Sequence, residues 1–257
     1  MSLYVYPILW TLFLWWFSTG VILYLNGLPR WTFKWTMLGT TGVLALSLVG
    51  LYATADDTRI TGAYLAFTCA LMVWAWQEVA FLLGYVTGSR RTPCPPSVRG
   101  WQRFKVAFQA VWHHELALLV LGVAVLTATW GEPNQTGVWT YAVLWIMRQS
   151  AKLNVFLGVR NLNESFLPPH LTYLQTYFRR RGMNGLFPVS VLLGTVVAWM
   201  LWQLATATGM GAFEITAFTF AATLLSLAVL EHWFLVLPLP SEALWAWGLR
   251  SREVRAP

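Results

Sequence analysis

Seven long apolar runs, separated by short polar segments, make up most of the chain. Each run is continuous and does not alternate between apolar and polar residues, so it predicts a helix and not a strand of a barrel. Each is also close to the roughly 20 residues with which a helix crosses about 30 Å of hydrocarbon. The runs cover residues 3–25, 36–53, 62–86, 108–130, 138–157, 185–208 and 212–236. The pattern predicts an all-α, polytopic membrane protein in which seven transmembrane helices form one membrane domain over residues 1–257.

Composition agrees with this fold class. Hydrophobic residues make up 57% of the 257 positions, charged residues only 11%, and 17 positions are tryptophan. A soluble domain of this length carries more charge. The first run lacks a basic segment before it and a small-residue cleavage site after it, so we expect a retained helix and not a signal peptide. Cys69 and Cys94 are spaced neither as a disulfide framework nor as metal ligands.

Basic residues fall in alternate loops. Most Lys and Arg residues follow the first, third, fifth and seventh runs, whereas the remaining loops hold Arg59 beside several carboxylates. Because Lys and Arg are enriched in cytoplasmic loops, seven spans place the N-terminus outside and the C-terminus in the cytoplasm. This asymmetry and the anionic headgroups of the lipid bilayer account for the net charge of +7, and no nucleic acid partner is needed.

Three segments on the predicted cytoplasmic side are long enough to have structure of their own: 87–107, 158–184 and the tail, 238–257. In the first, Trp101 and Arg103 belong to an interleaved aromatic and basic stretch that predicts a short interfacial helix running into the fourth span. In the second, aromatic residues at helical spacing precede Arg179, Arg180 and Arg181. We expect these five residues to contact lipid headgroups or a partner protein.

Ionisable residues inside the apolar runs are the most informative feature of the chain, because such residues are costly in hydrocarbon and mark functional sites. At about 1.5 Å of rise per residue, those on different helices lie at a similar depth. We therefore predict that they converge on one interior site, the buried polar ring. Its members are Glu78, His113, His114, Glu115, Arg148, Lys152, Glu231 and His232. Arg148 and Lys152 are four residues apart and share a helix face. Asn154 and Asn161, seven apart, share another.

Three interpretations of the buried polar ring are open. In the first, the ring is an ion-pair network in which three carboxylates nearly balance two cations. In the second, it is a carboxylate metal centre, and the candidate ligands are Glu78, His114, Glu115, Glu164, Glu231 and His232. The sequence has no Glu-x-x-His spacing, however, and adjacent ring residues point about 100° apart. In the third, His113, His114 or His232 ligates the central metal of a chlorin, or lines a quinone pocket, with aromatic residues packed against the ligand.

Five segments of the chain resemble the photosynthetic complex assembly protein 2 family, whose members are also called PuhE. The segments are 76–78 (WQE), 112–116 (WHHEL), 160–164 (RNLNE), 178–188 (FRRRGMNGLFP) and 230–233 (LEHW). The resemblance implies a factor that assists assembly of reaction centre and core antenna in the inner, cytoplasmic or intracytoplasmic membrane of purple phototrophic bacteria. It implies bacteriochlorophyll or a precursor as the ligand, and reaction-centre or core-antenna subunits and other assembly factors as partners. It supplies no catalytic residues.

Our leading hypothesis is thus a non-enzymatic assembly factor that binds or escorts bacteriochlorophyll or a late precursor. No nucleophile-base triad, P-loop or dinucleotide fingerprint is present, so the common soluble chemistries have no counterpart in this chain. The alternative is a membrane metalloenzyme that uses the Glu and His residues of the ring, as a di-metal centre, to modify a pigment or quinone. A second alternative is a scaffold whose ring only holds its helices together.

Overall fold

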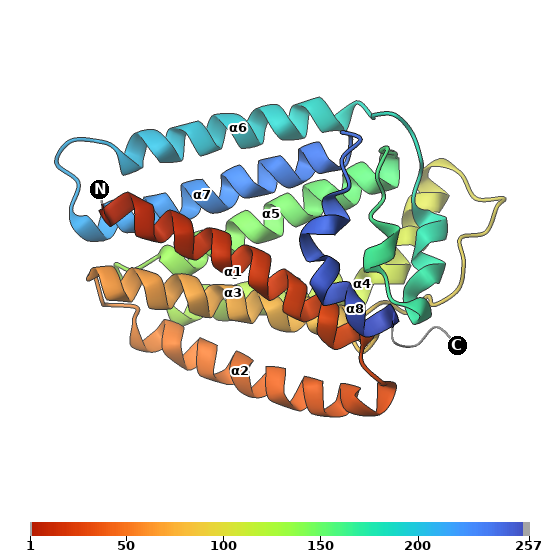
Figure 1. Ribbon diagram of the computed structural model, residues 1–257, viewed down its shortest axis with the longest axis horizontal. Helices are drawn as coiled ribbons and strands as arrows, with labels where there is room; N and C mark the ends of the chain where they lie inside the picture. The colour runs from red at the N-terminus through yellow and green to blue at the C-terminus, as the bar shows by residue number, and fades with distance from the viewer. Residues whose placement is uncertain (1, 254–257) are drawn as a thin grey trace.

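The computed structural model describes residues 2–253, and in this part of the chain seven long helices pack side by side in an up-and-down bundle (Figure 1). They are α1 (Ser2–Gly27), α2 (Phe33–Ala53), α3 (Ile60–Leu82), α4 (Gly100–Ala128), α5 (Thr136–Leu157), α6 (Leu186–Ala205) and α7 (Ala212–Phe234). Each lies on one of the seven apolar runs, and the described residues contain no β-strand. The all-α prediction is confirmed. The last four residues of the predicted tail, 254–257, lie outside the described residues.

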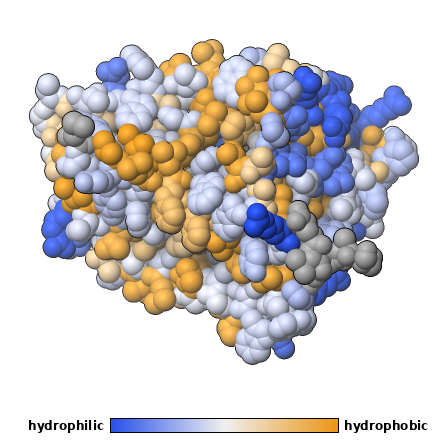
Figure 2. Space-filling view, viewed as in Figure 1, coloured by the Kyte–Doolittle hydropathy of each residue, from blue (hydrophilic) through white to orange (hydrophobic). Residues whose placement is uncertain are grey.

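Within the described residues, six helices are long and apolar enough to cross a membrane, and α5 is not among them. The α5 helix has 22 residues and runs through the same bundle, but Arg148, Gln149, Lys152 and Asn154 make it more polar than its neighbours (Figure 1). Apolar residues spread across the middle of the molecule, whereas hydrophilic residues gather mostly toward the end at which the C-terminus lies (Figure 2). The protein is therefore a multi-pass membrane protein, and a seventh span through α5 stays a prediction.

The centre of the bundle is formed by α3 and α7, which are buried along most of their length, whereas α2 and α6 expose large apolar side chains. Phe67 and Phe220 are fully buried and stack with ring centroids 4.2 Å apart, which joins α3 to α7. A Cβ atom at Gly194 would lie 2.8 Å from a methyl group of Val229, so the absence of a side chain lets α6 approach α7 closely. Small residues serve this purpose in membrane helices because lipid supplies no hydrophobic force between them.

Two helix boundaries differ from those predicted. The predicted span 62–86 ends early, because α3 stops at Leu82 and Gly84 turns the chain with a φ of +84°. The ring of His170 fills the space beside Gly84, and its Nε2 lies 2.9 Å from the carbonyl oxygen of Leu82. The α4 helix begins at Gly100, so Trp101 and Arg103 belong to it. The predicted interfacial helix is therefore the first turns of α4.

The loops after α3 and α5 and the tail lie at one end of the bundle, which we call the basic end (Figure 1). The segment after α5 contains two 3₁₀ helices, η2 (Glu164–Phe166) and η3 (Pro169–Tyr177), where aromatic spacing had indicated an α-helix. After α7, the chain forms η4 (Ser241–Trp245) and the short helix α8 (Ala246–Glu253).

The α8 helix and the residues before it pack against α1 (Figure 1). Trp245 Nε1 donates to the carbonyl oxygen of Trp16 at 3.0 Å, and Trp16 Nε1 donates to that of Leu244 at 2.8 Å. A Cβ atom at Gly20 would overlap the ring of Trp247, so the contact requires glycine there. The α1 helix, η4 and α8, from the two ends of the described chain, therefore pack together into one surface.

Arg252 of α8 ties this surface to the segment that follows α5. Its guanidinium donates to the carbonyl oxygen of Phe166 at 2.9 Å, to that of Leu167 at 3.4 Å and to that of Ser165. It also donates to Oδ1 of Asn26, at the end of α1, at 2.5 Å. One cation thus satisfies several carbonyl groups that the short η2 helix leaves free.

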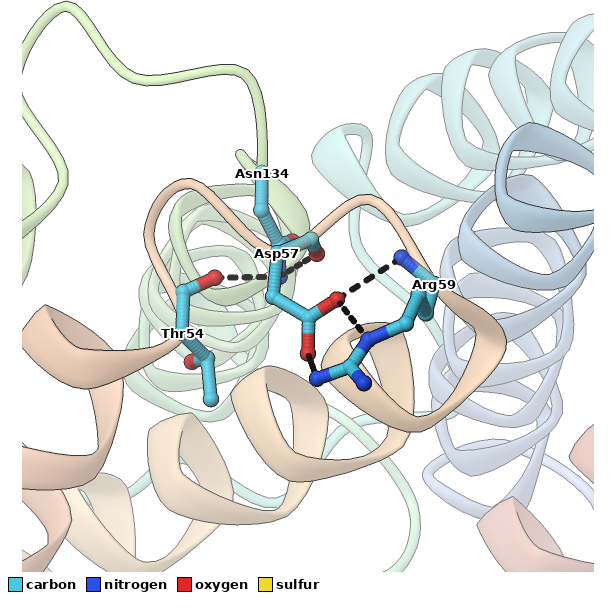
Figure 3. Close-up of polar contacts among 4 residues, drawn as sticks. All are labelled: Thr54, Asp57, Arg59 and Asn134. Carbon is cyan, nitrogen blue, oxygen red and sulfur yellow. Dashed lines mark hydrogen bonds and ion pairs between the residues drawn. The ribbon is translucent and has the colours of Figure 1, made fainter.

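The opposite end, which we call the acidic end, consists of short loops closed by one asparagine (Figure 3). Asn134 is fully buried, and its Nδ2 donates to the carbonyl oxygens of Thr54 at 2.9 Å and Asp57 at 3.2 Å. The carboxylate of Asp57 binds the guanidinium of Arg59 at 2.9 Å. The α2–α3 loop is therefore fastened to the α4–α5 loop by hydrogen bonds between side chain and backbone.

Candidate functional site

Four members of the buried polar ring form two ion pairs around α5. Arg148 Nη2 lies 3.1 Å from Glu78 Oε2 of α3, and Lys152 Nζ lies 2.7 Å from Glu115 Oε1 of α4. Gln149 Nε2 donates to the other oxygen of Glu115 at 2.5 Å. Residues 148 and 152 are one helical turn apart, so one side of α5 meets both partner helices. Removing one member of such a pair would leave a charge without its partner in a region of low dielectric constant.

The two adjacent histidines of α4 have opposite environments. His114 is 1% exposed, its ring lies 4.5 Å from that of Phe81, and neither ring nitrogen has a hydrogen-bond partner among the described residues. His113 is exposed on the outside of the bundle. Successive residues of a helix point about 100° apart, so burying one removes the other from the interior. The structure therefore settles which of the two faces inward.

The third histidine is held by two hydrogen bonds. His232 is 2% exposed, its Nδ1 lies 2.8 Å from the carbonyl oxygen of Ala228, and its Nε2 lies 2.9 Å from Ser150 Oγ. Since a carbonyl oxygen only accepts, Nδ1 carries the hydrogen and the Ser150 hydroxyl donates to Nε2. Its neighbour Glu231 is exposed and accepts a hydrogen bond from Trp15 Nε1 at 2.8 Å. The predicted ring thus has three exposed members, His113, Glu231 and Arg148, although Arg148 is still paired with Glu78.

The candidate metal ligands are not brought together. In the part of the chain that the structure describes, no three His, Cys, Asp or Glu side chains lie close enough to hold a metal ion. Glu164 lies in η2, where its Oε2 is 2.9 Å from Arg180 Nη2. Glu78 and Glu115 each bind a cation of α5, and a metal beside these cations would be repelled by them.

Aromatic rings follow one side of α4 from its start to His113, and we call them the α4 aromatic row. Trp101 and Phe104 stack with centroids 5.0 Å apart, and Phe108 follows 6.3 Å from Phe104. The ring of Trp112 lies 6.4 Å from Phe108 and 5.9 Å from His113. Spacings of three and four residues place the four aromatic residues on one face of the helix. The outside of α4 therefore presents flat rings next to a histidine.

A buried asparagine that was not among the predicted site residues connects α5 to α6. Asn184 Nδ2 lies 3.0 Å from Asn154 Oδ1, 3.1 Å from the Asn154 carbonyl oxygen and 3.0 Å from that of Gly158. Its Oδ1 accepts the backbone N–H groups of Leu186 and Phe187 at the start of α6. An asparagine just before an apolar run is a helix-start signal, and that signal would have found it.

The spacing of Asn154 and Asn161 predicted a shared helix face. This prediction is wrong, because α5 ends at Leu157 and Asn161 lies beyond it. Its Nδ2 instead donates to the carbonyl oxygens of Phe234 at 2.7 Å and Leu237 at 2.5 Å, which fastens the end of α7. Asn161, like Asn184, therefore holds a loop to the end of a helix.

Arg179, Arg180 and Arg181 do not form one cluster. A bridge between Val159 and Arg180 keeps this stretch extended, and successive side chains of extended backbone point in opposite directions. Arg180 binds Glu164, whereas Arg179 and Arg181 line a hollow that Arg103 also lines.

Comparison with known proteins places these features in a family. A protein of Rhodobacter capsulatus described as an uncharacterized 30.4 kDa protein in the puhA 5′ region is 40% identical over 251 residues. The similarity covers 95% of this chain and 90% of that protein. No solved structure matches the chain. Residues 1–256 match the family described as "Protein of unknown function (DUF3623)", and the chain therefore belongs to that family.

Proposed function

We propose that the protein is a membrane factor of the photosynthetic apparatus that assists assembly of reaction centre and core antenna by handling bacteriochlorophyll or a precursor. Two findings support a photosynthetic role: the Rhodobacter capsulatus relative is described by its place in the puhA 5′ region, a photosynthesis gene region, and the segments quoted above resemble an assembly family. The structural observation that carries pigment handling is the position of His113 at the end of the α4 aromatic row.

A chlorin has a flat apolar ring and a central metal that takes an imidazole nitrogen as a ligand, so its binding site needs both a histidine and flat rings. A pigment dissolved in the bilayer reaches only side chains on the outside of the bundle. His113 is exposed there, and its ring forms no hydrogen bond with the described residues. His114 is enclosed, and both nitrogens of His232 are already bound. His113 is therefore the histidine that best fits a pigment ligand, and Trp112 lies beside it.

The proposal includes a topology. We place α5 as the seventh span, because 22 residues suffice to cross the bilayer and both of its cations are paired with carboxylates of neighbouring helices. Seven spans put the N-terminus outside and the basic end in the cytoplasm of a bacterial inner membrane. Reaction-centre or core-antenna subunits and other assembly factors would then meet the protein at its basic end.

The pigment proposal is tested by the absorption spectrum of the protein purified in mild detergent from a pigment-making host. We expect a stoichiometric chlorin band in the visible and near-infrared range, which His113→Gln removes. His232→Gln is the matched control, because glutamine can replace its hydrogen bonds, and this variant should keep the band. A colourless wild-type protein, or equal loss in both variants, would contradict pigment binding at His113.

The assembly role has a separate test in a host that lacks the gene. Its membranes should contain less reaction centre and core antenna, and the wild-type gene should restore both. If amounts are unchanged without the gene, the assembly role is wrong. If the wild-type gene restores them and His113→Gln restores them equally, the protein acts as a scaffold and not through pigment.

A further inference from the structure

A hollow of about 410 Å³ opens at the basic end, between the start of α4 and the segment that follows α5. Its charged lining consists of Arg99, Arg103, Arg179 and Arg181, and the lining residues that the structure describes include no Asp or Glu. Four like charges without a counter-ion repel one another, so an anion between them lowers the energy of the arrangement. We propose that this arginine pocket binds a phosphate-bearing anion.

Backbone geometry directs two of the arginines into the arginine pocket. Arg181 N donates to Val159 O at 3.0 Å, and Val159 N donates to Arg179 O at 3.2 Å, so residues 179–181 run extended beside Val159. Alternate side chains then point the same way. Gly158 has a φ of +125°, and a Cβ atom there would lie 2.7 Å from Cδ of Arg181. The Arg181 side chain thus crosses a glycine that leaves room for it.

The inner wall is a buried arginine with a fixed position. Arg103 is 7% exposed, and its guanidinium lies 4.1 Å from the ring centroid of Phe156. It donates to the carbonyl oxygen of Phe156 at 3.2 Å and to that of Tyr177. These contacts are all to neutral groups, so the positive charge is retained without a carboxylate. Such pre-ordered positive charge favours an anion without further loss of side-chain entropy.

The start of α4 also provides a positive electrostatic potential that favours an anion. Arg99 is the N-cap residue of this 29-residue helix, and its side chain does not cap the first turn. The first N–H groups of a helix have no partner within it, and the helix dipole is positive there. Helix starts of this kind bind phosphate groups in many proteins. Since Arg99 also lines the arginine pocket, the helix start and the arginines act on the same space.

The ligand group that best fits the arginine pocket is phosphate, because the planar guanidinium matches phosphate oxygens with two parallel hydrogen bonds. The volume of the arginine pocket lies within the range of small-molecule pockets. Trp101 is exposed at the start of α4, next to Lys105, as is usual at the headgroup layer of a membrane. The phosphate can therefore belong to an anionic phospholipid or to a soluble phosphate ester. The inference does not depend on pigment binding.

The first test is calorimetric titration of the full-length protein in neutral detergent with inorganic pyrophosphate at constant ionic strength. Arg99→Gln and Arg181→Gln remove charges from opposite walls, and each should weaken binding about tenfold, because each removes charge-assisted hydrogen bonds to the anion. Arg180→Gln is the matched control, because it removes the same charge from the same run but outside the arginine pocket. Its affinity should stay within about twofold of the wild type.

The second arm identifies the source of the phosphate. The protein is reconstituted into phosphatidylcholine vesicles containing phosphatidic acid and then re-extracted, and retained lipid is measured by mass spectrometry. Enrichment of phosphatidic acid that Arg181→Gln abolishes assigns a lipid headgroup, whereas pyrophosphate binding without enrichment assigns a soluble phosphate ester. The proposal is overturned if neither probe binds, or if all three variants weaken binding equally, because a diffuse positive surface would then explain the data.

Discussion

The two ends of the bundle are built in different ways. At the acidic end, short loops are closed by Asn134, and Asp57 and Arg59 neutralise each other beside it (Figure 3). At the basic end, long segments pack over the helix ends, and four arginines share one hollow without a carboxylate. One end satisfies its polar groups internally, whereas the other keeps charge that its own residues do not neutralise. Because of this difference we expect recognition to take place at the basic end.

The largest loss of stability is expected at Asn184, on the side of the basic end. Asn184→Ala removes three donated hydrogen bonds to the end of α5 and two accepted at the start of α6. We expect the free energy of unfolding to fall by about 2 to 4 kcal/mol, because buried groups lose their partners and a helix loses its cap. Thermal unfolding in detergent measures the effect. Asn184→Asp keeps the acceptor and should lie between the two proteins; an unchanged midpoint for the alanine variant would show that the segment is held by other contacts.

The acidic end should respond to Asn134→Ala in the same way but less. This change removes the side-chain donor from the carbonyl oxygens of Thr54 and Asp57, of which Thr54 keeps the Asp57 N–H group, and Thr136 N loses its acceptor. We expect a loss of about 1 to 3 kcal/mol in the same unfolding assay. Asp57→Asn is the control at this end, because the Arg59 side chain of the pair is 81% exposed, so the pair contributes little and the midpoint should shift less. A larger shift for Asp57→Asn than for Asn134→Ala would reverse this account of the acidic end.

Changing the pH should alter the free energy of unfolding less than these substitutions do, and it should act differently on the two ends. Partial burial, reinforced by Arg30 and Arg252, holds the pKa of His170 below its usual value, although the Leu82 carbonyl opposes this. The folded protein therefore binds fewer protons than the unfolded chain, so this contribution to stability is complete above about pH 6.5 and falls as the pH drops through the folded pKa. Unfolding midpoints measured between about pH 7.5 and 5.5 should fall with pH, and less so in His170→Gln. Equal slopes would exclude His170 as a source.

At the acidic end, the guanidinium of Arg59 lowers the pKa of the Asp57 carboxyl from its usual value. That carboxyl stays ionised throughout the same pH range, and its contribution to stability is lost only in more acidic solution. The Asp57–Arg59 pair therefore adds nothing to the pH response between neutrality and mild acid.

The sequence predicted the helices well because seven apolar runs leave few alternatives for a membrane protein. It predicted the end of α3 wrongly, because the stop at Leu82 depends on Gly84 and on a histidine 88 residues further along the chain. The basic run 179–181 was predicted to contact lipid headgroups or a partner, but a local run gives no sign of the distant residue that keeps it extended. Side-chain direction there depends on Val159.

The candidate site was predicted in part for a similar reason. Depth along a helix follows from residue number, so the sequence alone places Glu78 and Arg148 at comparable levels. Rotation about the helix axis does not follow from residue number, and it decides that His114 is buried and His113 exposed. The buried asparagine at 184 was missed because its partners, Asn154 and Gly158, lie on the far side of a long loop.

The contact between α8 and α1 also bears on the order of events during synthesis. Ribosomes make α1 first, yet the surface around Gly20 is completed by Trp247, and Asn26 receives its hydrogen bond from Arg252. This surface of the first helix can therefore be covered only after α8 has been translated. Synthesis of the first helix and closure of this surface are thus separate steps in time, and translation of the intervening residues is the shortest interval between them.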